Sequence, residues 1–287
     1  MLKSIFGILI NLSSSTMSKL SIITINLNNA LGLERTINSV LEQDFIDYEF
    51  IIIDGGSTDG SLEIIKEYDS QITHWISEPD NGIYNAMNKG IKLAKGEYCY
   101  FLNSADWIYK ATTISNILNK NPSSDIVLCN ILFMVGGKEE LRTGIGKNFF
   151  TFKDIFDHWC HQSLLIKRSL FNSYGLYNEM YKITADWVFL LKVLALGEAT
   201  FEYIPEIIAY YDNNGISSQN TDWYSEKKHA MKEMIPPKIL DDYFSKNYNR
   251  FQRILSHQLS FFIFVNLNRL VILWQIVLGT NNKKRFH

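Results

Sequence analysis

The sequence predicts an α/β protein in which a mostly parallel sheet is flanked by helices and followed by a helical C-terminal appendage. Short apolar segments rich in β-branched residues alternate with segments whose apolar residues recur at helical spacing. Two of the apolar runs end in polar turns, IIIDGGSTDG and YCYFLNSADW. Strands that alternate with helices form parallel sheets, because each helix returns the chain across the sheet.

The first half of the chain supplies the expected parallel strands. We predict strands at 20–27, 48–53, 73–76, 98–102 and 126–135, with helices that begin near residues 33, 62 and 83. Ser57, Thr58 and Asp59 are side chains that can cap the second of these helices. Gly96 is expected to end the third helix, and Gly136 with Gly137 to end the last strand.

The second half has a less regular pattern. It contains an apolar stretch at 163–166, a predicted helix at 185–196 and a strand-like segment at 201–211. We expect this half to cover the carboxyl edge of the sheet. The predicted regions are an extension at 1–16, a catalytic domain at 17–221 with halves 20–135 and 138–221, and a helical region at 222–287.

Composition excludes some partners. The 28 basic and 30 acidic side chains nearly cancel, so the chain has no field that would attract nucleic acid. The three cysteines are widely spaced, with no CxxC pair, which is typical of buried thiols in a reducing compartment. Residues 1–16 contain no small-residue cleavage site and are too few to span a bilayer. The chain is therefore expected to be cytoplasmic.

The apolar segment 261–278 contains Asn266, Asn268, Arg269 and Gln275, and basic residues follow it. These polar residues make a spanning helix costly. An amphipathic helix in the headgroup region, with its basic end near anionic lipid, fits the pattern. The alternative is a helix packed on the domain or on a second subunit.

Polar side chains lie at four successive ends of the predicted strands: Thr24 with Asn26, Asp54, Glu78 with Asp80, and Asn103 with Asp106. Ligands of open α/β sheets bind at the carboxyl ends of the strands. The chain has neither GxGxxG nor a phosphate-binding loop with its lysine. A nucleotide is therefore expected to bind through carboxylates and a metal.

Seven segments in order carry a resemblance: TINLNN, IIIDGGSTDGS, SEPDNGIYNAMNKGI, YFLNSADW, CHQSLLIKRSLF, ITADWVFLLK and YYDNNGISS. Together they resemble the family 2 inverting glycosyltransferases of the GT-A fold, over roughly residues 20–218. The resemblance is closest to bacterial enzymes that build exopolysaccharide and lipopolysaccharide. It implies a nucleotide-sugar donor, most often a UDP-sugar, and a glycan or lipid-linked acceptor at the inner face of the cell membrane.

The resemblance implies roles for the strand-end residues. Thr24 and Asp54 match the pair that holds the uracil base, with Asn26 beside them. Asp80 stands at the position where the family contacts the nucleotide, just before a helix. The N-terminus of that helix would stabilise a bound diphosphate. Asn103 is assigned to the same donor site.

YFLNSADW stands where the family has its acidic metal motif, but Asn103 and Ala105 replace two of the acids. Asp106 is therefore the implied ligand of Mn²⁺ or Mg²⁺, which take oxygen ligands including phosphates. Such an ion neutralises charge on the departing nucleoside diphosphate.

Asp186 in TADW matches the family's general base, with Ala185 in place of a glutamate. An inverting transfer needs a base within reach of the acceptor hydroxyl. His161 and Gln162 match the diphosphate and acceptor region, and Trp187 could stack on a sugar.

Each assignment has a structural alternative. Asp54, Asp80, Asp106 and Asp186 could each be a turn former or a helix-end charge, and His161 and Trp187 could be core residues. A sugar-phosphate nucleotidyltransferase is a rival function, although TINLNNALGLER lacks the lysine and glycines of its first loop. A degenerate glycosyltransferase kept for binding is a second rival, because acids are missing at Asn103, Ala105 and Ala185.

Overall fold

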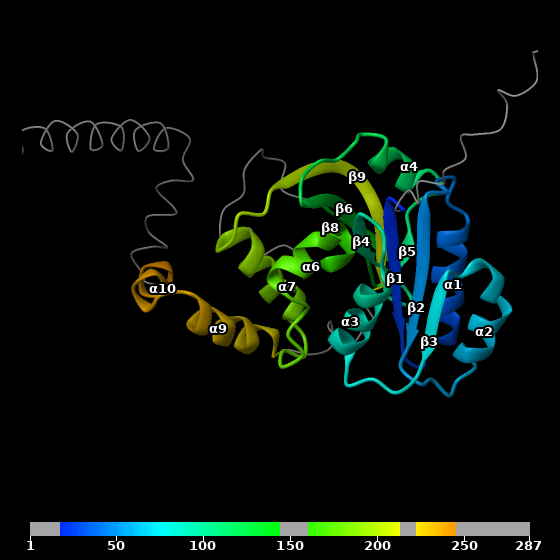
Figure 1. Cartoon of the computed structure of the whole chain (residues 1–287), viewed down its shortest axis with the longest axis horizontal. Coiled ribbons are helices and arrows are strands. Elements are labelled where there is room, and N and C mark those ends of the chain that lie inside the picture. The colour runs from blue at the N-terminus through cyan, green and yellow to red at the C-terminus, as the bar shows by residue number, and fades with distance from the viewer. Residues whose placement is uncertain (1–17, 144–159, 213–221, 245–287) are drawn as a thin grey trace, which may run out of the picture. The chain divides into compact units, whose positions relative to one another are not determined.

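The computed structural model describes residues 18–143, 160–212 and 222–244 (Figure 1). The chain divides into two units, Met1–Lys227 and Lys228–His287. The first unit contains a nine-stranded sheet with the order β3-β2-β1-β4-β8-β6-β9-β5, and β7 pairs with β6. The predicted extension at 1–16 and the apolar segment 261–278 lie outside the described residues.

The first half of the sheet is parallel, as expected. Its elements are β1 (Leu20–Asn26), α1 (Ala30–Leu41), β2 (Tyr48–Asp54), α2 (Ser61–Glu67), β3 (His74–Ser77), α3 (Ile83–Leu93) and β4 (Tyr98–Phe101). The register pairs Asn26 with Asp54, and Asp54 with Ser77. Three polar residues therefore lie side by side at the carboxyl edge.

Both faces of these strands are covered, which explains why the strands read as continuous apolar runs. Figure 1 shows α1 and α2 on one side and α3 on the other. On the α3 side, a Cβ atom at Gly90 would lie 2.5 Å from Cγ2 of Ile23. The helix can approach the sheet this closely only because residue 90 has no side chain.

The start of α2 is capped by one of the expected side chains, that of Asp59, whereas the expected end of α3 was wrong. The N-cap of α2 is Gly60, at φ +98°, and it makes no side-chain cap hydrogen bond; Asp59 instead accepts from the Ser61 N–H and hydroxyl. Helix α3 ends at Leu93, before Gly96. Gly96 is needed for packing, since a Cβ there would lie 2.6 Å from the Ser21 nitrogen.

The second half continues the same sheet with mixed strand directions. Its elements are β5 (Trp107–Ile108), α4 (Thr113–Leu118), β6 (Ile126–Val135), β7 (Lys138–Arg142), η2 (His161–Ser163), β8 (Leu164–Lys167), α6 (Arg168–Tyr174), α7 (Ala185–Leu190), η3 (Leu191–Ala195) and β9 (Phe201–Asp212). Strand β8 is antiparallel to both β4 and β6, whereas β9 is parallel to β6. Gly136 and Gly137 both have positive φ, as a tight hairpin turn requires. They connect β6 to β7, a hairpin that was not predicted from the sequence.

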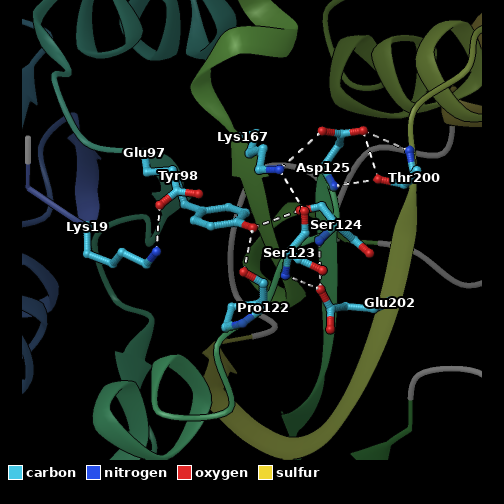
Figure 2. Close-up of polar contacts among 10 residues, drawn as sticks. All are labelled: Lys19, Glu97, Tyr98, Pro122, Ser123, Ser124, Asp125, Lys167, Thr200 and Glu202. Atoms are coloured by element: carbon cyan, nitrogen blue, oxygen red, sulfur yellow. Dashed lines mark hydrogen bonds and ion pairs between the residues drawn. The ribbon is translucent and has the colours of Figure 1, made fainter.

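Polar contacts join the two halves at the edge opposite the strand ends named above (Figure 2). The Tyr98 hydroxyl donates to the Ser124 carbonyl at 2.8 Å, and Lys167 donates to the Ser123 carbonyl at 2.7 Å. Asp125 accepts hydrogen bonds from the Thr200 N–H and hydroxyl. These polar groups form hydrogen bonds with one another, so we assign this edge of the sheet a structural role.

The described part of the C-terminal region is helical, with α9 (Trp223–Met234) and α10 (Pro237–Phe244). Among the described residues, no helix is both long enough and apolar enough to cross a membrane.

Candidate active site at the carboxyl edge

A cavity of about 720 Å³ opens at the carboxyl edge of the parallel strands. Its lining includes five residues that the sequence singled out: Asn26, Asp80, Asn103, Asp106 and Gln162. The N-terminal end of α3 contributes Gly82 and Ile83 to the wall. The structure therefore brings together polar groups as far apart in the chain as Asn26 and Gln162.

Asp54 and Thr24 lie behind this wall and are not among its lining residues. Both are fully buried, and the Thr24 hydroxyl donates to the Leu102 carbonyl at 2.8 Å. The Asp54 carboxylate accepts from the Ser57 and Ser77 hydroxyls and from the Asn26 amide. Burial acts to raise the pKa of Asp54, but these hydrogen bonds hold it below its usual value.

Asn26 is oriented by Asp54. Its Nδ2 donates to Asp54 Oδ1 at 2.8 Å and lies 3.2 Å from Ser57 Oγ. The amide oxygen is buried and has no hydrogen-bond partner among the described residues. A buried acceptor without a donor is costly, so Asn26 Oδ1 is a group to which a ligand can donate.

Asp106 is the buried carboxylate of the cavity, with 3% of the residue exposed. Oδ1 accepts from the Asp212 N–H at 2.9 Å, and Oδ2 accepts from Gln162 Nε2 at 2.9 Å. Burial raises the pKa of Asp106 to about 7, although both hydrogen bonds act to lower it. A carboxyl group in a cleft whose pKa is strongly raised by burial is a candidate functional group.

The loop that carries Asp106 is held by α1. The Thr36 hydroxyl donates to the Asp106 carbonyl at 2.7 Å and accepts from the Ala105 N–H at 3.1 Å. Arg35 donates to the Ala105 carbonyl at 2.7 Å. Ala105 has φ +84°, a strained conformation that these contacts stabilise. Sequence reasoning missed Thr36, a polar residue on the apolar face between Leu33 and Ile37.

His161 connects the cavity to Asp186. Its Nε2 lies 3.0 Å from Asn103 Nδ2, and its Nδ1 lies 2.9 Å from Asp186 Oδ2. Because the Asn103 amide nitrogen can only donate, this arrangement assigns a neutral imidazole that donates from Nδ1 to Asp186. The two side chains of the His161–Asp186 pair are 11% and 15% exposed.

Asp186 lies at the start of α7 and is surrounded by donors. Its Oδ1 accepts from the Trp187 N–H at 2.8 Å and lies 2.8 Å from the Tyr84 hydroxyl. Burial acts to raise the pKa of Asp186, but the hydrogen bonds from His161 and Tyr84 outweigh it and lower the pKa. Asp186 is not among the described residues that line the cavity, which it reaches through His161 and Asn103.

The segment before α7 is held by Glu226 of α9. Its carboxylate accepts from the N–H groups of Lys182, Ile183 and Thr184, and from the Thr184 hydroxyl at 2.9 Å. This anchoring fixes the helix start that carries Asp186. No motif in the sequence pointed to Glu226, because the contact joins segments 42 to 44 positions apart.

Two further predicted residues have distinct surroundings. Asp80 Oδ1 accepts from the Gly82 N–H at 2.8 Å, and a Cβ at Gly55 would lie 2.5 Å from Asp80 Oδ2. Trp187 is 3% exposed, and the Lys227 amine lies 4.9 Å from its ring centroid. Trp187 is therefore packed inside the domain and does not line the cavity.

The donor set suits a hard cation. In the described ranges, no three His, Cys, Asp or Glu side chains gather as a metal site. Asp106 nevertheless lies on the cavity wall beside the buried amide oxygens of Asn103 and Gln162, which have no hydrogen-bond partner among the described residues. A carboxylate with neutral oxygen donors can hold Mg²⁺ or Mn²⁺ when a phosphate ligand completes the set.

Comparison with known proteins gives consistent results. Residues 21–173 match the family model described as glycosyl transferase family 2. A PGL/p-HBAD biosynthesis glycosyltransferase of Mycobacterium tuberculosis is 30% identical over 206 residues, which cover 68% of this chain and 77% of that protein. An uncharacterised glycosyltransferase of the same species is 32% identical, with 69% and 76% covered.

Solved structures share the fold. TarS 1–349 of S. aureus in complex with UDP-GlcNAc aligns with a TM-score of 0.64 at 19% identity, and covers 83% of this chain and 73% of that one. The mannosyltransferase PcManGT from Pyrobaculum calidifontis, in complex with GDP-Man and Mn²⁺, aligns with a TM-score of 0.53 at 15% identity. The alignment with PcManGT covers 74% of this chain and 60% of that one.

Proposed function

Because this chain belongs to glycosyl transferase family 2, we propose that it transfers a sugar from a UDP-sugar to a hydroxyl of a glycan or lipid-linked acceptor. The transfer inverts the anomeric centre, and it serves bacterial cell-surface polysaccharide synthesis at the cytoplasmic face of the membrane. The observation that carries the proposal is the hydrogen-bonded chain from Asn103 through His161 to Asp186. It links the cavity wall that holds Asp106 to the half-buried, ionised carboxylate of Asp186.

The donor base is proposed to bind at Asn26. Asp54 engages the Asn26 amide nitrogen and leaves the amide oxygen without a partner among the described residues. A uracil N–H would donate to this oxygen, while Asp54 and Thr24 act from behind the wall. The complexes of TarS with UDP and UDP-GlcNAc support this choice of nucleotide.

The diphosphate is proposed to lie near Asp80 and the start of α3. Gly82 and Ile83 line the cavity there, and a helix N-terminus stabilises anionic groups. Asp106, with phosphate oxygens, would hold Mn²⁺ or Mg²⁺, and the bound ion supplies charge neutralisation for the departing UDP. The Mn²⁺ complex of PcManGT supports the use of a divalent ion.

Asp186 is proposed as the proton acceptor for the attacking hydroxyl. An inverting reaction needs this base on the face opposite the leaving diphosphate. Donors from His161 and Tyr84 keep the carboxylate ionised, so it is ready to receive a proton at neutral pH. We propose that His161 and Gln162 bound the acceptor region and that Trp187 supports it from the core.

A donor panel tests the proposal. Thermal shift with UDP-sugars and GDP-sugars, with and without Mn²⁺, should show stabilisation by a UDP-sugar. Transfer assays with the stabilising donor should then show that Asp186→Asn lowers kcat by about 10²–10⁴-fold and leaves donor affinity within a factor of about two. Asp125→Asn, a change at the opposite edge, is the matched control and should keep wild-type turnover.

Two results would count against this function. Stabilisation by no nucleotide sugar would reject the donor site. Full activity of Asp186→Asn would reject the proton acceptor. If wild-type protein binds the donor but shows no turnover, a glycosyltransferase-like binding protein would be favoured instead. The absence of Asp186 from the described residues that line the cavity motivates this alternative.

A further inference from the structure

Two aspartates from separate parts of the chain meet on the cavity wall. Asp106 belongs to the loop after β4, and Asp212 is the last residue of β9. The backbone N–H of Asp212 donates to Asp106 Oδ1 at 2.9 Å, and both residues line the 720 Å³ cavity. Pairing of β9 with β6 and β5 brings Asp212 to this point from 106 positions away.

A buried amide oxygen lies in the same place. Gln162 donates from Nε2 to Asp106 Oδ2 at 2.9 Å, so the orientation of its amide is set by Asp106. Its Oε1 is buried and has no hydrogen-bond partner among the described residues, and only 3% of the residue is exposed. A buried acceptor without a partner costs free energy. This indicates that a ligand places a cation or a hydrogen-bond donor against Gln162 Oε1.

Arg35 fixes the position of Asp212. Its Nη2 lies 3.0 Å from Asp212 Oδ2 and donates to the Ala105 carbonyl at 2.7 Å. The guanidinium also lies 4.1 Å from the centroid of the Trp107 ring, which stacks on Tyr210 at 4.7 Å. Carboxylates that bind metals are commonly oriented by such an outer hydrogen-bond partner.

We infer that Asp212 completes the divalent-cation site, with Asp106 as the other carboxylate and Gln162 Oε1 as a neutral oxygen ligand. Asp212 thereby supplies, from the end of β9, a carboxylate that the motif loop lacks at Asn103 and Ala105. The inference rests on the proposed function, because phosphate oxygens of the donor and water would fill the remaining positions. Two carboxylates with phosphates are a common environment for Mg²⁺ and Mn²⁺.

A purely structural role for Asp212 makes a different prediction. In that case the Arg35–Asp212 pair would only tie α1 to β9, and its loss would change stability without changing cation binding. A measurement of Mn²⁺ binding therefore separates the two roles, whereas a measurement of activity alone would not.

The experiment is a titration of Mn²⁺ into the full-length protein, alone and with saturating UDP, followed by electron paramagnetic resonance of free Mn²⁺ and by calorimetry. Asp212→Asn should weaken Mn²⁺ binding at least tenfold in both titrations. Its affinity for UDP measured in EDTA should stay within a factor of two of wild type. Asp125→Asn is the matched control, because it also removes an aspartate that pairs with a cation, at 3.4 Å from Lys167, far from the cavity.

Wild-type Mn²⁺ affinity in folded Asp212→Asn would overturn the inference. If that variant does not fold, Asp212→Glu keeps the charge while displacing the carboxylate by one methylene. It should also weaken Mn²⁺ binding, and unchanged affinity would overturn the inference equally.

The inference and the proposed function fail in distinguishable ways. Wild-type protein that binds UDP but no Mn²⁺ would overturn the cation site and leave the transferase intact. Wild-type protein that binds no UDP would count against the transferase, and the titration with Mn²⁺ alone would still decide the role of Asp212.

Discussion

At the scale of single residues, the candidate site depends on hydrogen bonds that orient amides and carboxylates. Asp54 sets the direction of the Asn26 amide, and Asp106 sets that of Gln162. In each case the nitrogen is engaged and the oxygen remains unpaired among the described residues. Asp54 therefore acts on the cavity through the Asn26 amide, whereas Asp106 and the Gln162 amide that it orients both line the cavity.

Replacement of Asp54 by asparagine should destabilise the protein by roughly 2–3 kcal/mol at pH 7, because buried donors lose a charged acceptor. The pKa of Asp54 is lowered in the folded state, so its contribution is complete above the ordinary aspartate pKa of about 4. The contribution is lost as pH falls through the lowered folded value. Urea unfolding at pH 7 and pH 3 should show a smaller difference between variant and wild type at pH 3. An equal difference at both values would contradict this account.

His161 should control the pH dependence of transfer through Asp186. Its N–H donation lowers the pKa of Asp186, and Asp186 must be ionised to accept a proton. His161→Ala should therefore move the acid limb of the kcat/KM profile to higher pH. His161→Asn, which can offer an amide N–H near the Nδ1 position, should keep that limb close to wild type.

The measurement is a pH–rate profile for the three proteins with one donor and one acceptor. Tyr84 and the Trp187 N–H are the other groups that face the carboxylate, and both remain in each variant. Identical acid limbs in all three proteins would show that His161 does not tune Asp186.

At the scale of secondary-structure elements, close packing positions the site. Helix α3 carries the cavity-lining residues Gly82 and Ile83 at one end and Gly90 against β1 at the other. Helix α1 holds the loop of Asp106 through Thr36 and Arg35. The helices that cover the sheet therefore also fix the loops that form the site.

Gly90→Val should destabilise the protein by about 1–3 kcal/mol, because its side chain would overpack the contact with Ile23. The free energy of unfolding in urea measures this loss. Lys92→Val is the matched control on the exposed side of the same helix and should change stability by less than about 0.5 kcal/mol. Helix propensity alone would make Gly90→Val stabilising and Lys92→Val slightly destabilising, so unchanged or raised stability of Gly90→Val would contradict the packing account.

At the scale of the whole molecule, a parallel half and a mixed half share one sheet. Strand β4 pairs with β1 in parallel and with β8 in antiparallel orientation, so the junction lies at β4. This junction places Asn103, just after β4, opposite His161, just before β8. The polar cluster of Figure 2 closes the opposite edge.

The sequence of the C-terminal tail supports a prediction about the intact protein. Apolar residues with scattered polar ones at 261–278, followed by Lys283, Lys284 and Arg285, predict binding to an anionic membrane surface. Removal of residues 258–287 should abolish cosedimentation with vesicles that contain phosphatidylserine, while neutral vesicles bind neither form. Unchanged binding of the shortened protein would reject a membrane role for the tail.

Several features could be predicted from local patterns. Continuous apolar runs predict the buried parallel strands, because such a run is stable as a strand only when both of its faces are covered. The polar residues that follow each run lie at the edge of the sheet where ligands bind. The motif loop around Asp106 and the segment before α7 were placed by resemblance. The β6–β7 hairpin was not foreseen, because it depends on the left-handed backbone of Gly136 and Gly137. The helix end at Leu93 was not foreseen either, because Gly96, which was expected to end the helix, lies beyond it and packs against Ser21.

By itself, the sequence determined the family, the parallel half of the sheet and the polar edge of the cavity, since those follow from periodicity and from motifs that are continuous in the chain. Only the tertiary structure decided which amide oxygens are left without a hydrogen-bond partner among the described residues. It also decided that Asp54, Asp186 and Trp187 are not among the lining residues of the cavity and that Asp212 meets Asp106. The physical reason is that hydrogen-bond partners and burial depend on contacts between segments far apart in the chain. No local pattern records those contacts.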